Sequence, residues 1–134
     1  MAFEEVKTHF RGGKLRKHYW LNDSSIGFGE YRDYYANGQL WEHTFLSSGH
    51  RHGEVKIFNY DGTLFHHYLV DGDNKDLATV IFYGDPSTHT EEELIEIAKE
   101  HNLPLLSDIP KTEAELTHWN LKHPDMPFLP IEST

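Results

Sequence analysis

The sequence predicts a mainly β protein, an antiparallel sheet of stacked β-hairpins with a short α-helical cap at its C-terminal side. Three observations lead to this fold class. All ten glycines lie at or before Gly84, whereas all six prolines lie at or after Pro86. Sixteen of the 18 aromatic residues precede residue 85. A pattern of turn and strand also returns after 24 residues. Aromatic residues suit a pleated surface and glycine suits tight turns, so residues 1–85 should form the sheet and residues 86–134 the cap of the same domain.

The hairpins are predicted from "NGQL" at 37–40 and "DGTL" at 61–64. Asn-Gly or Asp-Gly between alternating apolar residues is typical of a two-residue type I′ loop, in which both central residues take positive φ. Such loops fix which residues face each other on neighbouring strands. The expected pairs are Tyr34 with Trp41, Arg32 with His43, Phe58 with Phe65 and Lys56 with His67.

The repeat extends well beyond the turns. Gly29-Glu30 returns 24 residues later as Gly53-Glu54, and His43 returns as His67. An earlier, degenerate copy reads "GGKLRKHYW", and a final half copy reads "ATVIFYGD". An internal repeat of this length indicates an array of one supersecondary unit.

The stretch "GEYRDYYANGQLWEHTFLSSGHRHGEVKIFNYDGTLFHHYLVDG" resembles the variant MORN repeat. The resemblance covers roughly residues 10–84. The pattern is also similar to the bacterial YwqK-type antitoxin family. It implies MORN-like hairpins in an elongated antiparallel sheet that serves as an interaction surface. The helical C-terminal part has no counterpart in the repeat.

Two helices are expected in the cap, over residues 90–101 and 112–122. Each begins with threonine followed three residues later by glutamate, the pattern of a capping box, and each stops before a proline. The boxes are Thr90 with Glu93 and Thr112 with Glu115. The tail "HPDMPFLPIEST" holds too much proline for regular structure. We expect it to lie along the surface through Met126, Phe128 and Leu129, or to act as a docking peptide.

Charge and composition narrow the classes of partner. The net charge is -10, and only residues 1–20 are basic, with five Lys and Arg against two acids. Nucleic acid is therefore not an expected partner, whereas a basic protein is. The chain has no cysteine, which excludes disulfides, thiolate metal sites and a cysteine nucleophile. No run approaches the roughly 20 apolar residues of a membrane span, and the N-terminus lacks the apolar run of a signal peptide, so a cytoplasmic protein is predicted.

Alternation along the strands separates two faces of the predicted sheet. One is rich in phenyl rings and is expected to be the core beneath the helices: Tyr34, Trp41, Phe45, Phe58, Phe65, Leu69, Val80 and Phe82. The other mixes tyrosines with carboxylates and a histidine, a composition that suits a protein interface. The predicted partner-binding residues are Tyr31, Asp33, Tyr35, Glu42, His66 and Tyr68. The alternative is that Leu40, Ile57 and Leu64 put the core on this second face.

Eleven histidines raise the possibility of a metal site. His18, His43 and His67 share one column of the repeat, but equivalent residues two strands apart are separated by about 9.5 Å. Ligands of one zinc ion lie within about 4 Å of each other. The stretch "GHRHGE" offers a closer set: His50, His52 and Glu54. We find no motif of an established catalytic site and expect no cofactor.

The sequence therefore predicts a non-enzymatic interaction module that binds a partner protein. The family resemblance implies that it neutralises that partner, a toxin or an effector enzyme. Two alternatives stay open: a metal-dependent enzyme or ligand binder that uses the clustered histidines, and a homodimeric or membrane-associated scaffold. The scaffold hypothesis rests on exposed tyrosines and on a small basic and aromatic patch at residues 7–20.

Overall fold

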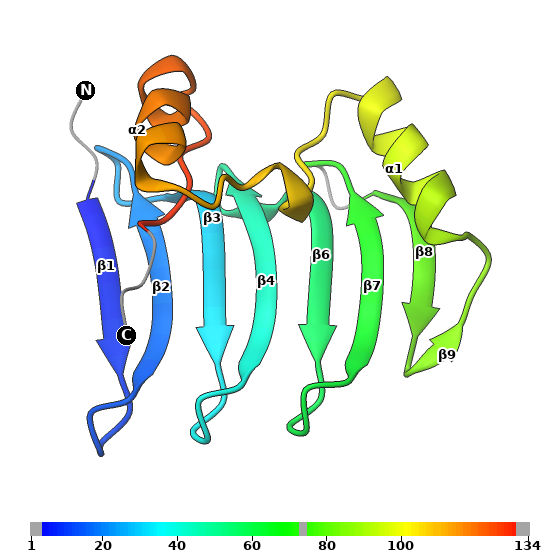
Figure 1. The fold of residues 1–134 in the computed structure, drawn as a ribbon, viewed down its shortest axis with the longest axis horizontal. Coiled ribbons are helices and arrows are strands. Elements are labelled where there is room, and N and C mark those ends of the chain that lie inside the picture. Colours follow the sequence, from blue (N-terminus) through cyan, green and yellow to red (C-terminus); the bar gives the residue numbers. More distant parts are fainter. Residues whose placement is uncertain (1–3, 73–74, 131–134) are drawn as a thin grey trace.

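The computed structural model describes residues 4–72 and 75–130, and it confirms the predicted sheet of successive hairpins (Figure 1). The strands are β1 (Glu4–His9), β2 (Leu15–Leu21), β3 (Gly27–Tyr34), β4 (Leu40–Ser47), β5 (His50–Arg51), β6 (Gly53–Phe58), β7 (Leu64–Val70), β8 (Asp76–Phe82) and β9 (Asp85–Pro86). They pair antiparallel in the order β1-β2-β3-β4-β6-β7-β8-β9, and the short β5 pairs with β4. Apart from the short β5, each strand thus pairs with the strands that precede and follow it in the sequence.

The hairpin loops have three residues, and the predicted two-residue loops at Asn37–Gly38 and Asp61–Gly62 are wrong. Tyr35 N–H donates to Gln39 O at 2.8 Å, and Gly38 N–H donates to Tyr35 O at 3.0 Å. Gly38 has φ +92°, whereas Asn37 does not take positive φ. The same bond pattern closes the loops at 10–14, 22–26 and 59–63. The third loop residue has positive φ in each case, as three-residue hairpin loops require: Gly13, Ser25, Gly38 and Gly62.

The longer loop shifts the pairing only beside it, because an extra residue on the following strand, Trp41 in β4, restores the register. Tyr34 lies opposite Leu40 and Phe58 lies opposite Leu64, so the predicted pairs of Tyr34 with Trp41 and of Phe58 with Phe65 are wrong. Farther from the loop the register returns to the prediction. Arg32 lies opposite His43, and Lys56 lies opposite His67.

The cap consists of α1 (Glu91–Glu100), a 3-10 turn η1 (Leu106–Asp108) and α2 (Glu113–Lys122). Thr90 and Glu93 form the full capping box, with bonds of 3.1 and 2.9 Å. At α2, Thr112 accepts a bond from Glu115 N–H at 3.3 Å without the return bond, so only half of the second box forms. Both helices lie toward the end of the sheet away from the loops that join β1 to β2, β3 to β4 and β6 to β7 (Figure 1).

The core lies between these helices and one face of the sheet. Leu69 and Ala78 pack against Leu94 and Ala98 of α1. Phe45 packs against Leu116 of α2 and against Phe128. The predicted core residues Phe45 and Leu69 are fully buried, and Val80 packs partly buried against the α1 cluster.

Two residues assigned to the core lie in solvent. Trp41 is 43% exposed and Phe82 is 53% exposed. Trp41 is the extra residue of the bulge, since its neighbour Leu40 takes the place opposite Tyr34. Phe82 ends β8, where a tight turn at Tyr83–Gly84 reverses the chain into β9.

The proline-rich tail is part of the core, which corrects the prediction that it lies along the surface. Phe128 is completely buried and Leu129 is 1% exposed. The Phe128 ring lies 4.7 Å from Trp119 and 5.8 Å from Phe45, measured between ring centres. Residues 131–134 of the tail lie outside the described residues.

Candidate interaction face

The candidate site is the face of the sheet turned away from the helices, which we call the uncovered face. Leu69 contacts α1, so its neighbour Tyr68 on β7 points to the opposite side. Residues directly opposite each other in antiparallel strands share a face. Asp33 pairs with Glu42, Glu42 with Ile57, and Ile57 with His66, which makes one row across β3, β4, β6 and β7.

A second row lies beside the first on the uncovered face. Tyr31 is opposite Thr44, and Tyr68 is opposite Val55. Thr44 and Val55 are fully buried, so Tyr31 and Tyr68 are the partly exposed members of this row. The structure therefore brings five of the predicted binding residues onto one face: Tyr31, Asp33, Glu42, His66 and Tyr68.

Arg51 stands at the centre of this face, although the sequence prediction did not include it. It comes from β5, which returns along β4 after a tight turn in which Ser48 and Gly49 both have positive φ. Its Nε donates to Glu42 Oε2 at 2.6 Å and its Nη2 donates to Glu42 Oε1 at 2.9 Å. This two-bond pairing holds the guanidinium in one orientation. A signal in the sequence would have been "SSG" before His50, because the dipeptide Ser-Gly marks a turn.

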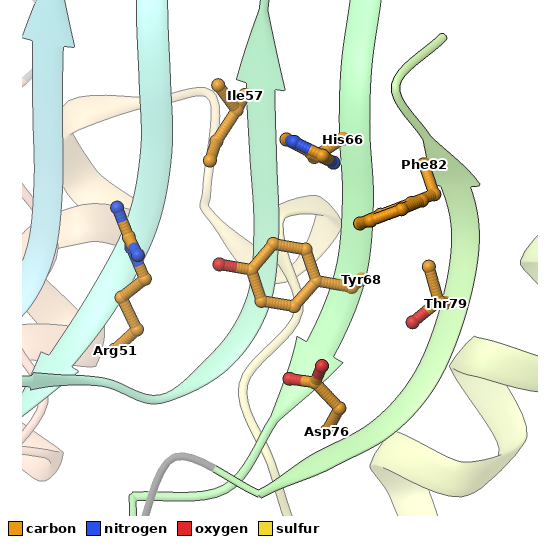
Figure 2. A pocket seen from close by; sticks show the side chains of 7 residues that line it. All are labelled: Arg51, Ile57, His66, Tyr68, Asp76, Thr79 and Phe82. Carbon is orange, nitrogen blue, oxygen red and sulfur yellow. The ribbon is translucent and has the colours of Figure 1, made fainter. Parts of the chain in front are cut away.

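Two shallow hollows meet at Arg51. The first has a volume of about 300 Å³ and is lined by Arg51, Ile57, His66, Tyr68, Asp76, Thr79 and Phe82 (Figure 2). The second has a volume of about 350 Å³ and is lined by Tyr31, Glu42, Leu46, Gly49, His50 and Arg51. Figure 2 shows the Tyr68 ring between Arg51 on one side and Phe82 and Thr79 on the other. The hollows together form a trough that crosses the strands.

Three titratable side chains of the trough, Tyr31, Tyr68 and His66, have pKa values shifted toward the neutral form. Burial raises the pKa of the Tyr31 phenol, and the negative charges of Asp33 and Glu42 raise it further. Burial also raises the pKa of Tyr68. Burial and the charge of Arg51 lower the pKa of His66 below its ordinary value of 6.5. The trough therefore presents two phenols and a neutral imidazole around the Arg51–Glu42 pair, with the Asp76 carboxylate at the lining of the first hollow.

Asp33 is a buried carboxylate at the edge of this group. It is 7% exposed, and burial raises the pKa of its carboxyl above the ordinary value. Tyr31 Oη donates to Asp33 Oδ2 at 3.4 Å, which is a long bond. Asp33 thus contributes charge and positions Tyr31, while it offers little surface of its own.

Tyr35 lies apart from the other predicted binding residues, at the loop end of the sheet. Its hydroxyl donates to Phe58 O at 2.7 Å. Its ring stacks on Trp41 at 5.3 Å and meets Tyr60 edge-on at 5.2 Å. Tyr35 directly follows β3 and pairs with Gln39 beside the loop, which places it at this end of the sheet.

A cluster of rings, with Phe82 and Tyr83 exposed and Phe65 and His66 half-buried, extends the face toward the loop end. Phe65, His66, Phe82 and Tyr83 contact one another, with ring centres between 4.4 and 5.2 Å apart. Tyr83 is 63% exposed. Exposed aromatic clusters are characteristic of interaction sites. The sequence prediction had placed Phe82 on the opposite face.

The predicted metal set is not brought together. His50 is exposed and His52 is half-buried, but Glu54 is on the covered face. There, Glu54 Oε2 lies 2.6 Å from His67 Nε2, and Glu54 Oε1 accepts a bond from Leu106 N–H at 2.8 Å. Within residues 4–72 and 75–130, no group of three or more His, Asp or Glu residues is placed to hold a metal ion.

The histidine column of the repeat has a different role from metal binding. Each histidine is paired with the glutamate 13 residues before it: His18 with Glu5 at 2.6 Å, His43 with Glu30 at 2.7 Å and His67 with Glu54 at 2.6 Å. Glu5 precedes Glu30 by the same 25 residues that separate His18 from His43, so the pairs were present in the repeat. The prediction followed the histidines alone and missed the glutamates.

Comparisons of the chain with protein-family models, with curated proteins and with solved structures found no match. The resemblance to the variant MORN repeat therefore stays an expectation from the sequence. Among the described residues, no helix is long and apolar enough to cross a membrane.

Proposed function

We propose that this protein is a non-enzymatic interaction module that binds another protein through the uncovered face and blocks it. One observation carries the proposal. The helices and the tail cover one face of the sheet, whereas the opposite face presents tyrosine, arginine and carboxylate side chains in ordered rows around a trough.

The composition of the trough supports protein binding. The few residues that dominate the binding energy of protein interfaces are enriched in tyrosine and arginine. Tyr31, Tyr68 and Arg51 meet here, and the pairing of Arg51 with Glu42 reduces the entropy that a partner would have to remove. The adjoining Phe82 and Tyr83 add apolar area that a partner can cover.

The net charge of -10 favours a basic partner. That the partner is a toxin or an effector enzyme, and that binding neutralises it, rests on the resemblance to the YwqK-type antitoxin family. The cytoplasmic location expected from the sequence belongs to the same proposal, and cell fractionation tests it.

The test begins with the full-length protein as bait in its native host, followed by mass spectrometry and purification of the captured protein. We expect Arg51→Ala and Tyr68→Ala each to weaken binding of that protein by about tenfold or more. The matched control is Leu121→Ala, because Leu121 is 78% exposed on α2, away from the trough. This control should bind like the wild type.

Two further readouts decide between outcomes. The thermal midpoint of each variant should stay close to that of the wild type, since a large fall would assign Tyr68 to the core. An activity assay of the captured protein should show inhibition by the wild type. The proposal fails if both trough variants bind as well as the control does, and the blocking role fails if the partner stays active in the complex.

A further inference from the structure

The tail docks on the repeat through a small set of backbone bonds. Glu30 N–H donates to Pro127 O at 2.9 Å, and Leu129 N–H donates to Glu30 Oε1 at 2.6 Å. The other carboxylate oxygen, Glu30 Oε2, lies 2.7 Å from His43 Nε2. One glutamate thus holds both ends of the tripeptide Pro127-Phe128-Leu129.

The same contacts recur in the next repeat with a different segment of the chain. Glu54 N–H donates to Pro104 O at 3.0 Å, and Leu106 N–H donates to Glu54 Oε1 at 2.8 Å. Glu54 Oε2 lies 2.6 Å from His67 Nε2. The docked tripeptide is Pro104-Leu105-Leu106. The two segments share the pattern proline, large apolar residue, leucine, which we write Pro-Φ-Leu.

The glycine before each glutamate selects the proline. A Cβ atom on Gly29 would lie 2.5 Å from Pro127 O and 2.8 Å from Pro127 Cδ. A Cβ atom on Gly53 would lie 2.5 Å from Pro104 O and 2.7 Å from Pro104 Cγ. Proline has no N–H group, so its close approach leaves no buried donor without a partner. The pair Glu5 and His18 has Glu4 in place of the glycine and therefore lacks this contact surface.

The remaining positions select an apolar residue and a backbone N–H. The Φ side chain is buried in both cases, with Phe128 at 0% and Leu105 at 4% exposed. Burial raises the pKa of Glu30, but the bond from His43 and the charge of Arg32 outweigh it and leave the pKa below its ordinary value. The carboxylate is thus ionised at neutral pH and accepts the leucine N–H strongly.

We propose that the Gly-Glu/His unit is a binding site for Pro-Φ-Leu segments, and that the unit at Gly29–Glu30 accepts such a segment from another protein in exchange for Pro127–Leu129. This site lies on the covered face and is separate from the trough. Its ligand is an extended peptide with proline, a large apolar side chain and a leucine whose N–H is free to donate.

The unit at Gly29–Glu30 is the exchangeable one because α2, the helix joined to its resident segment, buries fewer side chains than α1 does. Asn120 makes two bonds to the Phe128 backbone, at 3.0 and 2.8 Å, so α2 and the tail form one body. Leu116 is the buried side chain of α2. By contrast, Pro104–Leu106 directly follows α1, which buries Leu94 and Ala98 against β7 and β8.

The test uses a fluorescein-labelled, acetylated peptide with the sequence of residues 123–130, HPDMPFLP, and the full-length protein. Fluorescence anisotropy reports binding. The resident segment competes at an effective concentration of roughly millimolar, so the wild type should bind the peptide weakly. Phe128→Ala weakens the resident segment, and we expect it to bind the peptide at least about tenfold more tightly than the wild type does.

Matched variants identify the site. Glu30→Gln added to Phe128→Ala should abolish peptide binding, whereas Glu5→Gln in the same background should not, because Glu5 belongs to the unit without glycine. A peptide with alanine in place of its Phe should fail to bind. Equal binding by the Glu30→Gln and Glu5→Gln double variants would overturn the proposal.

A second variant covers the case in which Phe128→Ala does not fold. Asn120→Ala removes the bonds that join α2 to the tail and leaves the Phe128 ring in place. It should also bind the peptide more tightly than the wild type does. If its strand amide NMR signals match those of the wild type and the peptide still does not bind more tightly, the segment is not exchangeable and the inference is wrong.

Discussion

Glycine is required at positions 29 and 53 by the prolines that pack against them. Both residues have positive φ, +75° and +90°, and a Cβ atom on either would clash with a backbone oxygen. Positive φ alone costs a non-glycine residue about 1 kcal/mol. The clash adds to that cost because the proline backbone cannot move without displacing buried neighbours.

Alanine substitutions separate these two effects. We expect Gly29→Ala and Gly53→Ala to lower the free energy of unfolding clearly more than Gly84→Ala does. Gly84 also has positive φ, +82°, but a Cβ atom added there would meet no other atom within 4 Å. Urea unfolding of the three variants provides the measurement. Equal losses would show that backbone conformation alone explains the requirement.

Because Glu30 and Glu54 are paired with histidines, the free energy of unfolding should depend on pH. Burial raises the pKa of Glu54, but the bond from His67 and the bond from Leu106 N–H outweigh it and leave the pKa below 4.5, as for Glu30. A carboxyl with a lowered folded-state pKa stabilises the fold above the unfolded pKa and loses that contribution as the pH falls through the folded value. Stability should therefore fall as the pH drops below about 4.5.

Glu30→Gln checks this assignment. The variant should be less stable than the wild type at pH 7, by about 3 kcal/mol, since it leaves His43 and Arg32 without their carboxylate. The difference between variant and wild type should shrink as the pH falls below 4.5. Unfolding by urea from pH 7 to pH 3 measures both. A difference that stays constant with pH would contradict the role of the ionised carboxylate.

At the scale of elements, both helices begin after a capping threonine, but the capping hydrogen bonds are stronger at α1 than at α2. Thr90 and Glu93 bond each other's backbone in both directions, whereas Thr112 accepts a single bond of 3.3 Å. α1 also buries more of its surface against the sheet than α2, through Leu94 and Ala98. Helix α1 is therefore the better anchored element of the cap.

Replacement of the two N-capping threonines should reflect this difference. We expect Thr90→Ala to cost about 1 kcal/mol of unfolding free energy and Thr112→Ala clearly less. Thermal or urea unfolding of the two variants, with Thr88→Ala as an exposed control outside the helix, measures the costs. A larger loss for Thr112→Ala would mean that α2 contributes more to the fold than its contacts indicate.

At the scale of the whole molecule, the charge of the chain should govern how fast a partner arrives. A net charge of -10 steers a basic protein toward the surface, and salt screens this attraction over about 10 Å at 0.1 M. Association of the captured partner should therefore slow as salt rises from 50 to 500 mM, while dissociation changes little. Surface plasmon resonance separates the two rates. An association rate independent of salt would exclude a basic partner.

The sequence by itself determined the order of the strands, the starts of both helices and most of the candidate face. These features depend on neighbours a few residues apart, such as a turn glycine, a capping threonine or alternation along a strand. Alternation therefore placed Tyr31, Asp33, Glu42, His66 and Tyr68 on one face. It failed for Trp41, which is the extra residue where the register shifts beside the loop.

Only the tertiary structure decided what covers the sheet and what occupies the centre of the trough. Leu129 bonds to Glu30 across 99 residues of chain, and Leu106 bonds to Glu54 across 52. Contacts between such distant residues leave no periodic signal in either segment. The sequence therefore predicted that the proline-rich tail lies along the surface. Arg51 reaches Glu42 because β5 folds back along β4, and that return depends on the local turn and the strand pairing together.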